Sequence, residues 1–275
     1  MRVLLAWLGV WTADTARAAC PTSSPDRTVC PGGACDYTTI AAAVSAANND
    51  DVVCVDPGVY NTQIVANNKH VRVESSGPGV VVNGGSGGEI VRIENNADLE
   101  LVGIDIDGNN QRRCIFVTGV QSSLVLEGSD VSDCIQGTDG AGIFLGSQTF
   151  ARIEDSTFSD NGSGGNSGGA VFATGATSLD VLRTTFEGGR SGTAGAIRLQ
   201  STPATLDDVT FDDNEASAGN GGSVFSDGSG ALTVLGGSFA RGFSSNDGGC
   251  LAVGGSVTLE VVGTVFDGGT GRGAR

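Results

Sequence analysis

The sequence predicts an all-β protein, a right-handed parallel β-helix of about eight coils with an N-terminal capping helix. Two separate residue patterns recur through the chain with a period of about 27 residues, and a fixed period of this size indicates stacked structural units. The chain also contains 45 glycines among its 275 residues. Because glycine disfavours long helices and permits sharp bends, each unit is expected to consist of short strands and tight turns.

The first pattern is a pair of apolar residues one position apart, followed five positions later by a third. The pair alternates as strand residues do, since successive strand side chains point to opposite faces. Stacked coils should therefore bring equivalent residues into columns, with neighbouring strands about 4.8 Å apart. The third residue of the seven copies is Ile106, Val131, Phe158, Phe186, Phe211, Phe239 and Phe266.

The second pattern is a tetrapeptide, mostly of small residues, that ends in an aliphatic one. A coil must bend between its strands, and glycine, asparagine and aspartate tolerate the positive φ that bends require. Leucine-rich repeats have a similar length, but their L-x-x-L-x-L signature does not occur here. The copies are GGEI (87–90), RRCI (112–115), GAGI (140–143), GGAV (168–171), AGAI (194–197), GGSV (221–224) and GGCL (248–251).

Residues 1–18 have the pattern of an export signal. Arg2 precedes an apolar stretch at 4–11, and Ala16-Arg17-Ala18 forms a cleavage site of the A-x-A type. A disordered tail is the alternative interpretation. An export signal predicts a protein that is secreted or displayed on the cell surface.

Residues 19–50 are predicted to form a disulfide-stapled cap, and residues 51–275 the β-helix. Ile40, Ala43, Val44 and Ala47 form one apolar face of a short helix. Laid over the first coil, this helix would cover an open apolar end, as solenoids require. The last coil has no such cover in the sequence, which indicates either a truncated product or a second chain at that end.

Seven cysteines agree with an oxidising compartment. Four of them cluster near the start of the mature chain, where disulfides would staple the first structure, and two more lie one coil apart. The odd count leaves one free thiol, for which Cys250 is the expected residue. Zinc is a poor alternative, because there is no C-x-x-C pair and only one histidine. The disulfide candidates are Cys20, Cys30, Cys35, Cys54, Cys114 and Cys134.

A row of residues directly after the tetrapeptides is a candidate binding surface. The row reads Val91, Phe116, Phe144, Phe172, Arg198, Phe225 and Ala252. If the preceding aliphatic residues point inward, the four phenylalanines form an exposed stripe that could bind a glycan or a protein. If the strand is turned over, they fill the core instead. Alternation alone leaves both orientations open.

Four aspartates on two adjacent coils suggest calcium as a candidate ligand. Asp105, Asp107, Asp130 and Asp133 would repel one another at strand spacing. Calcium, which prefers several oxygen ligands, would relieve that repulsion. The alternative is a solvated acidic face without an ion. No other cofactor is indicated.

The segment Asp36–Tyr60 resembles the opening of the pectin-lyase-like β-helix superfamily, whose members often begin Y-x-T-I…A…A…D-x-V-x-V-x-P-G-x-Y. The later coils are similar to repeats of chlamydial-type polymorphic outer membrane proteins, marked by F-x-x-N and G-G-A-[ILV]. Phe158–Asn161 and Phe211–Asn214 match the first mark, and Gly168–Val171 matches the second. The resemblance implies a parallel β-helix. For the second family it also implies a passenger displayed on the bacterial cell surface, in association with the outer membrane.

The function that the sequence favours is binding or adhesion by a secreted or surface-displayed β-helix. The net charge of −16 argues against nucleic acid and anionic lipid as partners, and no later stretch is long and apolar enough to span a membrane. The alternative is a carbohydrate-active enzyme, a lyase or a hydrolase. Asp212 and Asp213 are a poor catalytic pair, since adjacent strand residues point to opposite faces. An enzyme should show charged side chains converging over one sheet.

Overall fold

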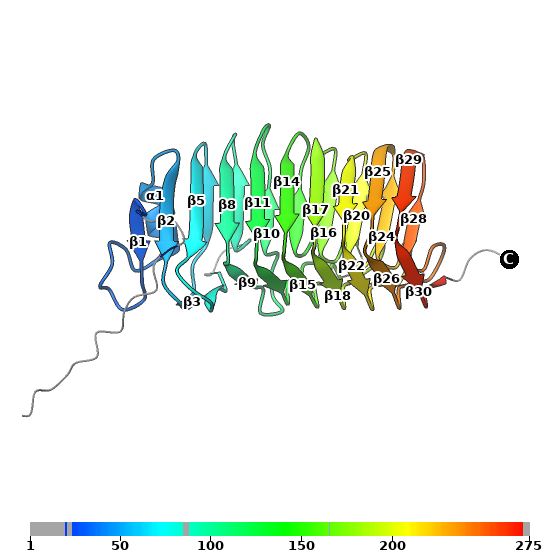
Figure 1. Ribbon diagram of the computed structural model, residues 1–275, viewed down its shortest axis with the longest axis horizontal. Coiled ribbons are helices and arrows are strands. Elements are labelled where there is room, and N and C mark those ends of the chain that lie inside the picture. Colours follow the sequence, from blue (N-terminus) through cyan, green and yellow to red (C-terminus); the bar gives the residue numbers. More distant parts are fainter. Residues whose placement is uncertain (1–19, 21–23, 85–87, 165, 272–275) are drawn as a thin grey trace, which may run out of the picture.

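The computed structural model describes residues 20, 24–84, 88–164 and 166–271. It is a right-handed parallel β-helix whose successive coils follow one another along a rod (Figure 1). Every strand pair is parallel, and each joins equivalent positions of neighbouring coils. The predicted fold class is therefore confirmed. The rod has about nine coils, judged by the nine strands of one sheet, which is one more than the sequence predicted.

Three long sheets form the sides of the rod, and a fourth short sheet lies in the turns. Sheet A contains β1 (Arg27–Val29), β2 (Asp51–Val55), β5 (His70–Ser75), β8 (Asp98–Val102), β11 (Ser123–Glu127), β14 (Phe150–Glu154), β17 (Ser178–Leu182), β21 (Ala204–Asp207), β25 (Ser229–Leu235) and β29 (Ser256–Val262). Sheet B contains β3 (Gly58–Tyr60), β6 (Val80–Val82), β9 (Asp105–Asp107), β12 (Asp130–Ser132), β15 (Thr157–Ser159), β18 (Thr185–Glu187), β22 (Thr210–Asp212), β26 (Ser238–Ala240) and β30 (Val265–Asp267).

Sheet C contains β4 (Ile64–Asn67), β7 (Val91–Glu94), β10 (Ile115–Val117), β13 (Ile143–Leu145), β16 (Val171–Thr174), β20 (Ile197–Gln200), β24 (Val224–Asp227) and β28 (Leu251–Val253). Sheet D contains β19 (Arg190–Ser191), β23 (Glu215–Ala216), β27 (Phe243–Ser244) and β31 (Thr270–Gly271). A full coil runs from sheet C to sheet A to sheet B and returns through a longer turn. The single helix of the described residues is α1 (Ile40–Ala46).

The core consists of columns of like residues. Phe158, Phe186, Phe211 and Phe239 are fully buried, at 1% exposure or less. Their rings stack with centroid separations of 4.5–5.2 Å between neighbouring coils. This arrangement confirms the column predicted from the third apolar position.

The F-x-x-N motif has a structural reason in the turn after sheet B. Asn214 is 1% exposed, and its side chain reaches the previous coil. Its Oδ1 accepts the backbone N–H of Gly189 at 3.0 Å, and its Nδ2 donates to the carbonyl of Phe186 at 3.0 Å. Gly189 must stay small, because a Cβ there would lie 2.8 Å from the Asn214 oxygen. Asn161 makes the equivalent pair of bonds to Cys134 and Val131.

Replacing Asn214 by alanine should lower the free energy of unfolding by about 2–3 kcal/mol, because one buried N–H and one buried C=O lose their partners. Urea denaturation of both proteins measures the difference. Asn61→Ala, at an exposed position, is the matched control and should change the free energy by less than about 0.5 kcal/mol. Equal effects of the two changes would contradict the role given to Asn214.

The N-terminal end of the rod is closed. Thr39 caps α1 by accepting the N–H of Ala42, and Ile40, Ala43 and Val44 are fully buried in the core. Lys69 donates to three carbonyls at the other end of the helix. β1 pairs with β2 and so extends sheet A into the segment predicted as a cap. The predicted signal peptide, residues 1–18, lies outside the described residues.

Three disulfides join the six candidate cysteines: Cys20–Cys54, Cys30–Cys35 and Cys114–Cys134. Cys250 is free and buried, as expected. At the other end of the rod the core columns continue into exposed positions, with Leu259 and Val261 at 39% and Phe266 at 49% exposure. Within the described residues no helix is long and apolar enough to cross a membrane.

Candidate functional site

The outer face of sheet A brings together three polar residues from three successive coils. His70 on β5 pairs in register with Asp98 on β8, and Asp98 pairs with Ser123 on β11. All three immediately precede an inward-pointing apolar residue, so they point outward by strand alternation. The column continues with Phe150 on β14. Parallel pairing thus fixes a row whose successive members lie 25–28 positions apart in the sequence.

Hydrogen bonds orient the imidazole of His70. Its Nδ1 lies 2.6 Å from Oδ2 of Asp98, and the Ser123 hydroxyl donates to Oδ1 of the same carboxylate at 2.5 Å. In neutral His70 this contact places the proton on Nδ1 and leaves a lone pair on Nε2. Among the described residues, none is within hydrogen-bonding distance of Nε2. The imidazole is therefore a proton acceptor held in a fixed tautomer, and it is 43% exposed.

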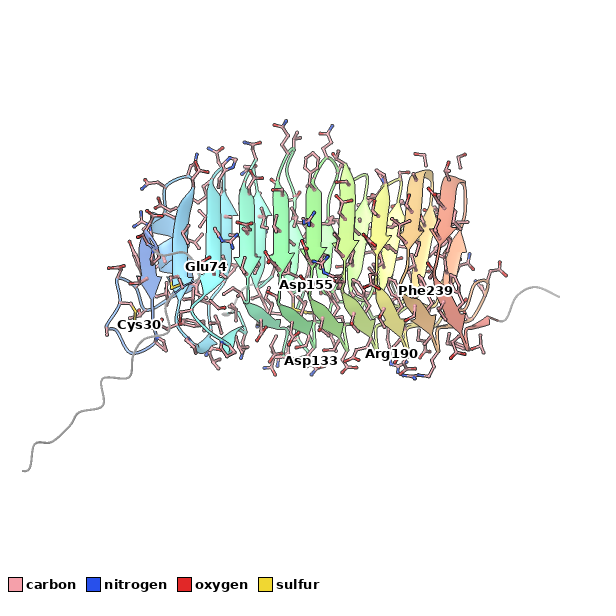
Figure 2. The ribbon with its side chains drawn as sticks, in the orientation of Figure 1. Cys30, Glu74, Asp133, Asp155, Arg190 and Phe239 are labelled. Atoms are coloured by element: carbon pink, nitrogen blue, oxygen red, sulfur yellow. A yellow bond between two sulfur atoms is a disulfide. The ribbon has the colours of Figure 1, made fainter. Side chains whose placement is uncertain are left out.

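A second outward column beside the first contains Arg72 and Glu100. Arg72 lies 2.7 Å from Glu100, and its Nε donates to Glu74 at 3.0 Å. Glu74 is fully buried and is marked beside the first coils in Figure 2. Burial opposes the charge of Arg72, but the hydrogen bonds to Glu100 and Glu74 outweigh it and raise the pKa of the guanidinium above its usual value. Arg72 therefore stays charged.

An open cavity of about 300 Å³ on the side of the rod is lined by His70, Asp98 and Ser123 of the first column and by Arg72 and Glu100 of the second. Asp50 lies at one edge, and Val52 and Val125 supply apolar lining. The ring of Phe150, one strand beyond Ser123, is 37% exposed and stacks on no other ring in the described part of the chain. The cavity and this ring together span about three strand spacings, or ~14 Å. We call His70, Arg72, Asp98, Glu100, Ser123 and Phe150 the sheet A site.

Comparison with known proteins identifies the fold family. A family model described as "Right handed beta helix region" matches residues 89–266. The chain belongs to this β-helix family. No curated protein sequence matches the chain.

Two solved structures follow a similar course. A pectin methylesterase from carrot aligns over 92% of this chain and 89% of its own, with 13% identity and a TM-score of 0.49. A pectin methylesterase mutant in complex with a hexasaccharide aligns over 78% of this chain and 82% of its own, with 11% identity and a TM-score of 0.42. The matching family model describes β-helix coils in general. The resemblance to polymorphic outer membrane protein repeats therefore stays a prediction.

The predicted aromatic row of this β-helix points outward. Phe116, Phe144 and Phe225 are half-buried and Phe172 is 7% exposed, and none of the four belongs to the main core. The prediction was wrong for one residue of the row, Val91. Val91 pairs with Ile115 and is fully buried, and the next residue, Arg92, takes the outward place beside Phe116. The GGEI copy is therefore out of register by one position.

The faces of these rings are covered. Phe116 and Phe144 stack at 5.0 Å, and the guanidinium of Arg113 lies 5.2 Å from both centroids. Arg113 is 7% exposed and donates to the carbonyl of Gly140, and burial lowers its pKa. Arg113 therefore covers these two rings and is itself withdrawn from solvent.

The four predicted calcium ligands are not brought to one point. Asp105 and Asp130 occupy one outward column of sheet B, and Oδ1 of Asp105 accepts the N–H of Asp130. Asp107 instead pairs with Ser132, and Asp133, with φ of 52°, lies in the following turn at the lower edge of the rod in Figure 2. Among the described residues, Cys30, Cys35 and Asp56 are the one group of three ligands close enough for one ion, and these cysteines form a disulfide.

Asp105→Asn should raise the melting temperature slightly at pH 7. Burial and the charge of Asp130 raise the pKa of Asp105, so its stabilising contribution is present at low pH and is lost as the pH rises through that pKa. The variant should melt with the wild type at about pH 3, where both side chains are uncharged. Asp107→Asn, whose column neighbour is Ser132, is the control. Stabilisation of the wild type by calcium that the variant loses would instead support the calcium hypothesis.

Sequence reasoning missed the sheet A site, although its register was available. The site column is the position just before the first apolar residue of each copy, and it reads His70, Asp98, Ser123, Phe150 and Ser178 in successive coils. The residue type changes from each coil to the next, and only serine occurs twice. A search for recurring residues does not detect such a column. Aligning the sequences of the coils and comparing the polar residues at each outward position would have found it.

Proposed function

We propose that the protein is a carbohydrate-active β-helix protein and that the sheet A site is where it binds and acts on a glycan. The observation that supports this most is the His70–Asp98–Ser123 row in an open cavity. An oriented imidazole with a free lone pair is the usual group for general base catalysis. Charged side chains converge over one sheet here, which is the feature expected of an enzyme.

The chemistry of the cavity suits a sugar. Sugar hydroxyls both donate and accept hydrogen bonds, and the cavity supplies carboxylates, a hydroxyl and an imidazole within a few strand spacings. The exposed ring of Phe150 adds an apolar surface at the end of this row, where a sugar ring could pack. The resemblance of Asp36–Tyr60 to pectin-lyase-like proteins supports a polysaccharide ligand as well.

In this proposal His70 accepts a proton at Nε2 from a water or a sugar hydroxyl. Asp98 stabilises the imidazolium that forms and fixes the ring orientation, and Ser123 holds Asp98. The ion pairs of Arg72 with Glu74 and Glu100 keep the floor of the cavity rigid. Because the disulfides agree with an oxidising compartment, we also propose that the protein works outside the cell.

A second candidate is a binder or adhesin without turnover. The half-exposed aromatic row on sheet C favours it, because Phe225 lies beneath the guanidinium of Arg198 at 4.3 Å and the row extends along the rod. Such a protein would retain a ligand but leave it intact.

One experiment tests both candidates. The untagged protein is run in native gels containing soluble polysaccharides (a glucan, a galactan, a mannan, chitosan and polygalacturonate) and is also incubated with each while new reducing ends and unsaturated products are followed. Retardation with turnover supports the proposal, and retardation alone supports the binder. No retardation by any polysaccharide overturns the carbohydrate proposal.

Phe150→Ala should weaken retention of the glycan several-fold, because the ring is the exposed apolar surface of the site. Affinity electrophoresis over a range of polysaccharide concentrations gives the dissociation constant. Phe225→Ala on sheet C is the control. A larger loss in the control would move the binding site to the aromatic row.

A further inference from the structure

We propose that the glycan taken by the sheet A site carries no carboxylate groups, which excludes polyuronides as its ligands. This inference rests on the proposed function and names the substrate class of the same site. It follows from three features of the cavity: the sign of its charges, the engagement of its one guanidinium, and the hydrogen-bonding character of its remaining atoms.

The lining is acidic. Asp50, Asp98 and Glu100 line the cavity, and Arg72 is the one lysine or arginine among the lining residues. The buried carboxylate of Glu74 lies against the same guanidinium. Counting these groups with His70 neutral gives four negative charges against one positive charge. A ligand carboxylate would therefore enter a cavity whose net charge has its own sign.

Arg72 is already engaged. A guanidinium holds a carboxylate best through two parallel N–H groups. Two of the nitrogens of Arg72 face Glu74 and Glu100, at 3.0 and 2.7 Å. To clamp a uronate through the edge of the guanidinium that carries Nε, Arg72 would have to break its ion pair with Glu74.

The remaining atoms of the row are acceptors. Neutral His70 donates a hydrogen bond from Nδ1 to Asp98, which leaves the lone pair of Nε2 available. The Ser123 hydroxyl donates its hydrogen bond to the same carboxylate. Acceptors attract donors, and hydroxyl or ammonium groups on a sugar are donors. An ionised carboxylate has no proton to donate. The row is thus matched to a neutral or amino-bearing sugar.

The net negative charge of the whole chain also disfavours the binding of a polyuronide. The net charge is −16 and the isoelectric point is about 4.2. A rod of this charge repels a polyanion before contact, and the repulsion is screened as the salt concentration rises. The preference against uronides should therefore be strongest at low ionic strength.

Matched hexasaccharides test the inference by calorimetric titration of the full chain at about 20 mM and about 300 mM salt, which bracket the physiological screening length. One pair is oligogalacturonate and its fully methyl-esterified form, which share a backbone and differ in charge. The other pair is the chitin hexamer and the chitosan hexamer, which separate neutral from amino-bearing ligands. The methyl ester should bind at least ~10-fold more tightly than the free acid at low salt, with a smaller ratio at high salt.

Glu100→Gln should narrow the gap between the acid and its ester, because it removes one lining charge and releases a nitrogen of Arg72. Glu260→Gln, an exposed change on β29 at the far end of the same sheet, should leave the ratio as in the wild type. Tighter binding of the free acid than of its ester would overturn the inference while leaving the carbohydrate proposal standing. If no hexasaccharide binds, the proposed function itself fails.

Discussion

Replacing Phe211 by alanine is expected to lower the free energy of unfolding by about 3–5 kcal/mol. The ring is fully buried and lies between those of Phe186 and Phe239, at 5.2 and 4.5 Å. A cavity at this place cannot be filled easily, because the stacked coils fix the positions of both neighbours. Guanidinium denaturation followed by circular dichroism measures the loss, and the melting temperature gives an independent value.

Phe150→Ala is the matched control for Phe211→Ala, since it removes the same side chain from the outer face of the rod. The Phe150 ring is 37% exposed, and its loss should cost less than about 1 kcal/mol. A comparable cost at both positions would contradict the division between inner column and outer face on which the description of the site depends.

Replacing His70 by glutamine should reduce glycan turnover by about 10²–10⁴-fold, because the proton acceptor is lost. Glutamine keeps a polar side chain of similar reach, so the dissociation constant should change by less than ~3-fold, well below 1.4 kcal/mol. Initial rates under saturating glycan and calorimetric binding separate the two effects. Turnover should also fall in Asp98→Asn, where the imidazole loses its orienting carboxylate.

Glu260→Gln, remote from the site on the same sheet, should keep the wild-type rate. Retention of wild-type turnover by His70→Gln would remove the histidine from the mechanism. If both turnover and binding are lost in His70→Gln while the melting temperature is unchanged, His70 contributes to binding and not specifically to catalysis.

Much of the fold was predictable because its stabilising residues repeat. The phenylalanine column is visible in the sequence since each coil buries the same side chain over the last one. Register at the start of the rod was less predictable. The tetrapeptide GGEI suggested that Ile90 occupies the place of Ile115, but the structure pairs Val91 with Ile115. A short apolar run such as Ile90-Val91 fits two registers, and only the contacts between coils decide between them.

The candidate site was less predictable because its residues do not repeat. His70, Asp98 and Ser123 differ in type, and their meeting depends on the exact number of residues in each coil. The predicted aspartate cluster shows a different error, because residues that do not lie together were grouped. Asp105 and Asp130 share a column, but Asp133 lies in a turn with positive φ, away from that column. Sequence proximity on adjacent coils is not enough, because strand alternation and turn geometry decide where each carboxylate points.

The most direct test of the sheet A site is nitrogen NMR of the imidazole, because the chain contains a single histidine and its signals need no assignment. Long-range ¹H–¹⁵N spectra of the untagged protein, recorded at a pH where the ring is neutral, should show the proton on Nδ1. Addition of a retained glycan should then shift the Nε2 signal, and Phe150→Ala should weaken that shift in proportion to binding. A proton on Nε2 in the free protein, or an unchanged histidine spectrum at saturating glycan, would contradict the account.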